Sequence, residues 1–72
     1  MIERRICIVG LGLMGGSLAK ALSGKVKTLI GVDRHAATRQ LALTSGDLDF
    51  VTGNLKDALE AADMVILANP VS

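Results

Sequence analysis

Three glycines follow a short apolar run near the start of the sequence. Gly10, Gly12 and Gly15 have the spacing G-x-G-x-x-G, the run before them covers residues 6–9, and a helical pattern comes next. Glycine at these places permits a tight turn, close approach of a ligand to the backbone, and close packing of helix on strand. Together they predict a turn that binds the pyrophosphate of a nucleotide.

The helix after this turn would contact the pyrophosphate through its backbone. The amides of Leu13 and Met14 face the ligand from the positive end of the helix, so no lysine is required. The motif G-x-x-x-x-G-K-[ST] does not occur in the sequence. Phosphoryl transfer by a Walker loop is therefore not expected.

An acidic residue stands at the distance that a dinucleotide site requires. Asp33 lies 18 positions after Gly15, at the end of a second apolar run. A carboxylate there accepts hydrogen bonds from the ribose hydroxyls and repels a 2′-phosphate, which favours NAD over NADP. Asp33 could instead only cap the next segment. Arg34 could stack on adenine, attract a 2′-phosphate or be a solvated loop residue. His35 has no acid or metal partner nearby in the sequence, so no catalytic role is assigned to it.

The apolar patterning predicts strands that alternate with helices. Strands are expected over residues 5–9, 28–32, 50–51 and 64–68, and helices over 14–22, over 36–44 and after the capping residue Asn54. Unbroken apolar runs, as in the first and last strands, are typical of strands covered on both faces. The alternation requires right-handed crossovers. We therefore expect a Rossmann-type α/β fold, with a parallel sheet and helices on both of its faces. This chain is expected to be truncated and to supply only the first half of that fold.

Each expected helix carries an apolar stripe at helical spacing. The predicted inner faces are Met14, Leu18, Ala21 and Leu22 in the first helix, Ala37, Leu41 and Thr44 in the second, and Leu55, Leu59 and Ala62 in the third. The stripes should cover the sheet.

Three segments should meet at one edge of this sheet, because the carboxyl ends of parallel strands lie together. They are residues 10–15, residues 33–34, and the pair Asn69 and Pro70 after the last strand. Asn69 would contact the nicotinamide side of the ligand or serve as a simple turn residue. The convergence of the three segments is the strongest argument for a dinucleotide site.

Composition limits the other classes of function. The chain has 72 residues, a formal net charge of +1 and one cysteine, Cys7. This charge gives no basic field for nucleic acid, and the apolar runs are too short to span a bilayer. A single cysteine excludes an internal disulfide and a thiolate zinc cluster, so no metal site is expected and a cytoplasmic protein is the default. Cys7 itself is expected to be a small buried hydrophobe, because nothing nearby would lower the pKa of its thiol.

Residues 8–19, 31–34 and 62–71 together resemble the start of the prephenate dehydrogenases, a group that includes the arogenate dehydrogenases. The most specific part is the run Gly-Gly-Ser-Leu-Ala that begins at Gly15. The resemblance implies NAD-dependent oxidative decarboxylation of prephenate to 4-hydroxyphenylpyruvate, the precursor of tyrosine. It also implies these cofactor-binding residues: Gly10, Leu11, Gly12, Leu13, Met14, Gly15, Asp33, Arg34, Asn69 and Pro70.

The resemblance places the chemistry outside this chain. A histidine that deprotonates the substrate hydroxyl and an arginine that holds a substrate carboxylate both lie beyond Ser72 in the family. A helical second domain, which dimerises and covers the substrate, is absent as well. Residues 1–72 are thus expected to be the N-terminal part of a dinucleotide-binding domain, with no catalytic residue of its own and no activity alone.

Two alternatives remain open at this point. The chain could be the same portion of a hydroxyisobutyrate-type hydroxyacid dehydrogenase, a group that shares Gly-Leu-Gly-x-Met-Gly. It could also be an NAD-sensing module that binds the cofactor, performs no chemistry and signals through a partner. The preference for prephenate or arogenate is open too.

Overall fold

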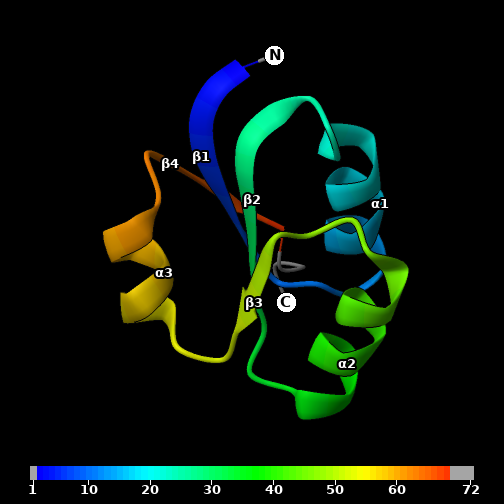
Figure 1. Ribbon diagram of the computed structural model, residues 1–72. Helices are drawn as coiled ribbons and strands as arrows, with labels where there is room; N and C mark the ends of the chain where they lie inside the picture. The colour runs from blue at the N-terminus through cyan, green and yellow to red at the C-terminus, as the bar shows by residue number, and fades with distance from the viewer. Residues whose placement is uncertain (1, 69–72) are drawn as a thin grey trace.

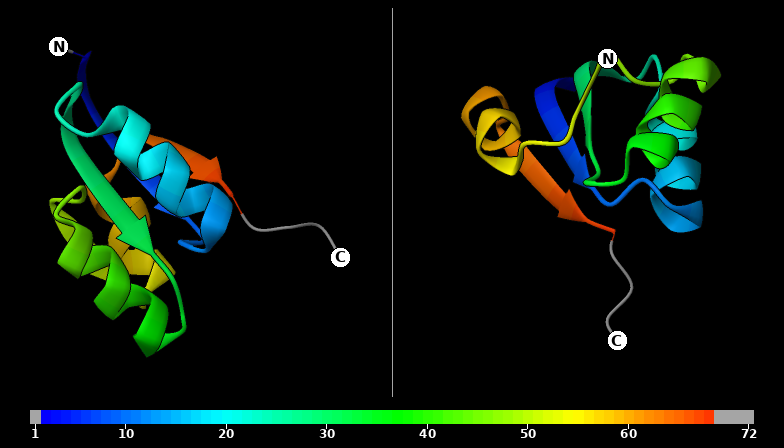
Figure 2. Two further views of the ribbon diagram at one scale, coloured as in Figure 1. Left: turned by 90° about the vertical axis from the view of Figure 1, so that its right-hand side faces the viewer. Right: turned by 90° about the horizontal axis from the view of Figure 1, so that it is seen from below.

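A computed structural model describes residues 2–68 of the chain. Its elements, in order, are β1 (Ile2–Val9), α1 (Leu13–Leu22), β2 (Val26–Val32), α2 (Ala36–Ser45), β3 (Phe50–Thr52), α3 (Leu55–Ala61) and β4 (Met64–Leu67) (Figure 1). The strands form one parallel sheet in the order β3-β2-β1-β4. Helices α1 and α2 lie on one side of the sheet and α3 lies on the other (Figure 2). The predicted Rossmann-type fold is confirmed.

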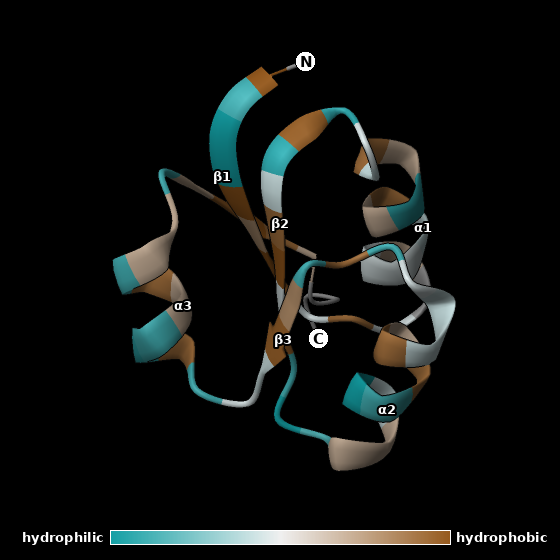
Figure 3. Ribbon diagram, in the orientation of Figure 1, coloured by the Kyte–Doolittle hydropathy of each residue, from teal (hydrophilic) through white to brown (hydrophobic). Residues whose placement is uncertain are grey.

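Two strands begin earlier than their apolar runs. β1 starts at Ile2 and β2 at Val26, and these two residues pair across the sheet. The polar residues 3–5 of β1 are exposed and form a hydrophilic stretch ahead of the apolar part of the strand (Figure 3). Backbone pairing therefore extends to Ile2 across an irregularity between Ile2 and Arg5, although residues 2–5 are exposed, and in β2 it adds the buried core residue Val26. Hydropathy alone does not detect an exposed strand segment such as residues 2–5.

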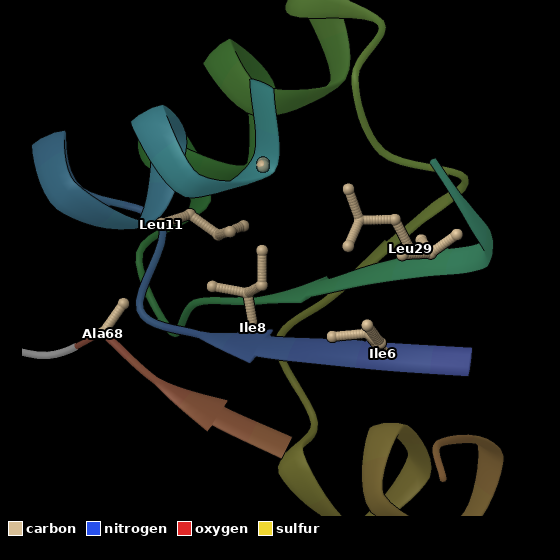
Figure 4. Close-up of a cluster of buried hydrophobic side chains, with 7 residues drawn as sticks. Ile6, Ile8, Leu11, Leu29 and Ala68 are labelled. Carbon is tan, nitrogen blue, oxygen red and sulfur yellow. The ribbon is translucent and has the colours of Figure 1, made fainter. Parts of the chain in front are cut away.

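The core has two layers, one on each face of the sheet. The layer under α1 and α2 consists of Ile6, Ile8, Leu11, Ala19, Val26, Leu29 and Ala68 (Figure 4). The layer under α3 consists of Cys7, Ile30, Val32 and Ala58. Successive residues of β1 therefore face opposite layers, which explains the unbroken apolar run. Cys7 is fully buried, as predicted, and burial raises the pKa of its thiol.

The helices approach the sheet through small residues, and the predicted inner faces were partly wrong. In α1, Leu18 and Leu22 pack on the core as predicted, whereas Met14 and Ala21 are exposed and Gly15 and Ala19 are buried. In α2, the three predicted residues Ala37, Leu41 and Thr44 are exposed, and Ala42 packs on the core. In α3, Leu55 and Leu59 are exposed, Ala58 is buried and Ala62 packs beside it. Small side chains let a helix axis lie close to the sheet, which leaves bulkier neighbours on the flanks.

The last strand differs from its prediction as well. β4 lies at the edge of the sheet and pairs only with β1 among the described strands. Leu67 is 76% exposed, and Met64 and Val65 are also exposed, so the apolar run is not covered on both faces in this chain. Position in the sheet, and not hydropathy, decides the burial of such a strand.

An ion pair fixes the beginning of β4 against β1. Arg5 donates through Nε and Nη2 to the Asp63 carboxylate at 3.3 and 3.2 Å, and the backbone N–H of Arg5 donates to the same group at 2.9 Å. Hydrogen bonds from the side chain and backbone of Arg5 lower the pKa of Asp63. The carboxyl end of β4 is thereby set beside the carboxyl end of β1.

The first turn of α3 is capped as predicted. Asn54 Oδ1 accepts hydrogen bonds from the backbone N–H groups of Lys56 and Asp57 at 2.9 and 3.4 Å. The cap satisfies donors that have no carbonyl partner within the helix.

The side chain and backbone of Asp49 join β2 to the segment before β3. Its Oδ2 accepts from the backbone N–H of Leu29 at 2.7 Å, and its own N–H donates to the Leu29 carbonyl at 2.8 Å. Leu29 is 1% exposed. Asp49→Ala should leave a buried N–H without an acceptor and lower the free energy of unfolding by about 1–3 kcal/mol, measured in urea.

The control for this measurement is Asp47→Ala. The hydrogen-bonded group of Asp47 is its backbone N–H, 3.4 Å from Ser45 Oγ, and the substitution leaves that group in place. Equal losses in the two variants would contradict the role given to the Asp49 carboxylate.

Candidate dinucleotide-binding site

The carboxyl ends of three strands meet where the strand order reverses. The N–H of Gly10, directly after β1, donates to the carbonyl of Val32 at the end of β2 at 2.7 Å. The N–H of Ala68, directly after β4, donates to the Val9 carbonyl at 2.8 Å. Ligands of open parallel sheets bind at such a switch point. The predicted meeting of residues 10–15 with Asp33 is confirmed, and Asn69 and Pro70 lie outside the described residues.

The three glycines of the turn meet three different physical requirements. Gly10 has φ 94°, a conformation that side chains disfavour. A Cβ at Gly15 would collide with the carbonyl of Gly10, so α1 can pack on the turn only without one. A Cβ at Gly12 would have no atom within 4 Å, so the backbone there is open to an approaching ligand.

The amino end of α1 has backbone N–H groups that the hydrogen bonds of the helix itself do not use. Its capping residue is Gly12, which gives no side-chain hydrogen bond, and the first turn holds no acid. The hydrogen bond from the N–H of Gly16 to the carbonyl of Gly12, at 2.8 Å, begins the helical ladder. The N–H groups of Leu13, Met14 and Gly15 come before it and have no carbonyl partner within the helix. Such an end binds anions.

The carboxylate of Asp33 is bound to two segments at once. Oδ2 accepts from the N–H of Leu11 in the glycine turn at 2.9 Å, and Oδ1 accepts from the N–H of His35 at 2.8 Å. Asp33 therefore caps the start of the next segment, which was the alternative role considered from the sequence, and it also binds the glycine turn through the N–H of Leu11. A carboxylate has about four acceptor positions, so capacity remains for a ligand.

Asp33 is ionised at neutral pH. Its side chain is only 12% exposed, and burial by itself would raise the pKa. The hydrogen bonds from the backbone of His35 and Leu11, followed by the His35 ring, outweigh that effect and lower the pKa of Asp33 below its usual value. The site thus presents a fixed negative charge.

His35 corrects one expectation. The ring atom Nδ1 lies 3.2 Å from Asp33 Oδ1, so His35 has an acid partner after all. The pair forms because Asp33 turns its carboxylate toward the residue two positions later, a common aspartate turn. The spacing Asp-x-His is the sequence signal that could have indicated this contact.

A groove of about 620 Å³ lies between these groups. Its lining residues come from the ends of β1, β2 and β3 and from the starts of the helices: Val9, Gly12, Val32, Asp33, Arg34, His35, Thr38, Gly53 and Leu55. Six lining residues were not predicted as site residues from the sequence: Val9, Val32, His35, Thr38, Gly53 and Leu55. β3 has only three residues, too few to show a clear pattern, although its carboxyl end follows the same rule as the others.

Some of the site residues predicted from the sequence line this groove, and others lie behind it or contribute only their backbone. Gly12, Asp33 and Arg34 line it, and Arg34 is exposed. The side chain of Leu11 is buried in the core, and its N–H is bonded to Asp33. The Met14 side chain is 70% exposed, so a role in holding an anion would belong to its backbone.

None of the helices within residues 2–68 combines the length and apolar character needed to cross a membrane. In the same range, no three His, Cys, Asp or Glu side chains are grouped so that they could hold a metal ion.

The strand order, the glycine turn at a helix start and the carboxylate after β2 define a Rossmann-type nucleotide-binding unit. A family model described as "NADP oxidoreductase coenzyme F420-dependent" matches residues 5–72, and the chain belongs to this family.

Two relatives confirm the resemblance to prephenate dehydrogenases. Cyclohexadienyl dehydrogenase of Zymomonas mobilis is 35% identical over an alignment 72 residues long, which covers 97% of this chain and 25% of that protein. Prephenate dehydrogenase from A. aeolicus, in complex with hydroxyphenyl propionate and NAD+, superposes with a TM-score of 0.84 at 32% identity. That match covers 97% of this chain and 26% of the other.

The fold extends to a more distant enzyme. Apo scyllo-inositol dehydrogenase from Lactobacillus casei superposes with a TM-score of 0.76 at 24% identity, over 96% of this chain and 22% of that one. The chain spans about a quarter of the length of these proteins. The hydroxyisobutyrate-type alternative has no better support than the prephenate dehydrogenase family.

Proposed function

We propose that this chain binds NAD and is the N-terminal, nucleotide-binding part of a prephenate or arogenate dehydrogenase. The observation that carries the proposal is the placing of an ionised Asp33 and the open amino end of α1 at one groove. The similar enzyme from A. aeolicus holds NAD+ in its crystal structure, which supports the same cofactor here.

The residues fit the two polar parts of a dinucleotide. The pyrophosphate would lie over Gly12, where the backbone is open, and accept from the N–H groups of Leu13 and Met14. Gly10 and Gly15 would shape the turn, and Leu11 would hold Asp33 in place through its N–H.

The adenosine ribose would donate to Asp33, with Arg34 beside the adenine. Asn69 and Pro70 are proposed to follow on the nicotinamide side.

The choice between NAD and NADP depends on Asp33. The description of the family mentions NADP and coenzyme F420, yet a fixed carboxylate with a lowered pKa repels a 2′-phosphate at neutral pH. Arg34, which also lines the groove, is a cation that could offset this repulsion, and it is exposed to solvent. We therefore propose NAD as the preferred cofactor.

The reaction we propose for the whole protein is the oxidation of prephenate or arogenate with loss of carbon dioxide. Bound NAD supplies the hydride acceptor. The only histidine of the chain, His35, lies beside Asp33 at the proposed ribose position, where it would contact the adenosine half of the cofactor and not the substrate hydroxyl. We place that step, and substrate binding, outside residues 1–72, in a helical domain that also forms a homodimer. A cytoplasmic location is part of the proposal and is supported by the one free, buried cysteine.

Calorimetric titration of the chain with NAD and NADP tests cofactor binding. Addition of prephenate and NAD tests whether the catalytic groups lie outside residues 1–72. We expect NAD to bind more tightly than NADP and no NADH to form with prephenate. A chain that binds neither dinucleotide would refute the proposed cofactor. Steady NADH production would show that the catalytic groups lie within these residues.

A further inference from the structure

The backbone of Asp33 is held by a side chain from α2 that does not line the groove. Arg39 Nη1 donates to the carbonyl oxygen of Asp33 at 2.7 Å in a half-buried position. The other side of the same residue is fixed as well, because the N–H of Asp33 donates to the Thr52 carbonyl at 3.1 Å. Both backbone polar groups of Asp33 therefore have defined partners.

Gly53 provides the space for this guanidinium. A Cβ at Gly53 would lie 2.7 Å from Arg39 Nη1, closer than real Cβ contacts, and 3.1 Å from Cζ, so the guanidinium would have to shift. The planar group thus lies against the backbone of the residue that follows β3. Arg39 joins α2, the end of β2 and the end of β3 in one arrangement around Asp33.

We propose that Arg39, seated against Gly53, is a positioning residue that sets the direction of the Asp33 carboxylate and thereby the preference for a ribose 2′-hydroxyl over a 2′-phosphate. Fixing both backbone groups of a residue fixes its Cα–Cβ direction, and hydrogen bonds to hydroxyls require such alignment. The inference rests on the proposed binding of NAD, since it concerns the same carboxylate.

Position and charge predict opposite effects for Arg39. As a cation near Asp33, it would by Coulomb attraction favour a 2′-phosphate, so removal of its charge alone should raise the preference for NAD. As a positioning residue, its removal should lower that preference, because the backbone of Asp33 would shift and turn the carboxylate, which Leu11 and His35 still hold, away from the direction that meets the hydroxyl and repels the phosphate. A merely structural residue would weaken both dinucleotides equally.

The test compares the dissociation constants of NAD and NADP in the longest polypeptide that carries this sequence. Arg39→Gln should lower the ratio of the NADP constant to the NAD constant about tenfold, which corresponds to ~1.4 kcal/mol. Arg4→Gln removes the same charge from an exposed position on β1 and should leave the ratio unchanged. A ratio that rises, or stays constant while both constants worsen, overturns the inference.

Gly53→Ala provides a second, independent arm if Arg39→Gln does not fold. It keeps the charge of Arg39 and displaces only the guanidinium, so the same drop in the ratio is expected. The unmodified protein separates the two levels of the proposal. If it prefers NAD and neither variant changes that preference, only the role of Arg39 fails, whereas if it binds neither dinucleotide, the proposed function and this inference fail together.

Discussion

Gly12→Ala is expected to weaken NAD binding roughly 100-fold, about 3 kcal/mol, while the chain remains folded. The backbone of Gly12 has φ −67° and ψ −158°, an extended conformation that alanine also adopts, and the added methyl group would meet no protein atom within 4 Å. The cost to stability should stay below about 1 kcal/mol, as for other changes at a helix N-cap. The methyl group would instead occupy the space proposed for the pyrophosphate.

Gly15→Ala should damage both properties. The new Cβ would collide with the carbonyl of Gly10, a backbone atom that cannot move aside as a flexible side chain can. Inserting atoms into a packed interior costs about 1–3 kcal/mol, and the upper end is expected here. The amino end of α1 would shift, so NAD affinity should fall together with the free energy of unfolding.

Gly16→Ala is the matched control for both substitutions. The nearest atom to its Cβ, outside the helix's own backbone and its chain neighbours, is the Leu11 carbonyl oxygen at 3.9 Å, an ordinary contact. Alanine in a helix is about 0.8–1.0 kcal/mol more favourable than glycine, so stability should rise and binding should be retained. Urea unfolding and calorimetric titration of the three variants separate the roles. Unchanged NAD affinity in Gly12→Ala would refute the placing of the pyrophosphate.

Asp33→Asn is expected to remove most of the discrimination against NADP. The amide keeps the shape of the side chain and one acceptor oxygen, but it loses the charge that repels a 2′-phosphate. The ratio of the NADP to the NAD dissociation constant should fall at least tenfold, about 1.4 kcal/mol or more. Asp33→Ala should also weaken NAD more than NADP, and it should lower stability because Leu11 and His35 lose their acceptor.

Asp63→Asn is the control for the charge at Asp33. Asp63 is also a carboxylate with a lowered pKa, but it precedes β4 and pairs with Arg5, at the end of the sheet opposite the groove. Its substitution should leave the ratio of the two constants unaltered. Equal losses of NAD and NADP affinity in Asp33→Ala would refute the assignment of Asp33 to the ribose.

The sequence by itself determined the order of the elements and the position of the glycine turn and Asp33. These features depend on short-range properties: hydropathy with a period of a strand or helix, glycine where a turn or close approach needs it, and a polar residue directly after an apolar run. Because parallel strands end at one edge, the order of elements also predicted that the turn and Asp33 would meet, as the hydrogen bond from Leu11 to Asp33 confirms.

Only the tertiary structure decided which helix faces pack and that Arg39 and Thr52 hold the backbone of Asp33. The helices lie close to this sheet at the small residues Gly15, Ala19, Ala42 and Ala58. The distance between a helix axis and the sheet decides which side chains make contact, and the sequence of one helix does not encode that distance. Likewise, Arg39 donates to the Asp33 carbonyl because the start of α2 lies beside the ends of β2 and β3. Gly53 has no side chain that would displace the guanidinium. The glycine spacing specifies where a dinucleotide would bind, and contacts between distant segments fix the carboxylate proposed to choose between NAD and NADP.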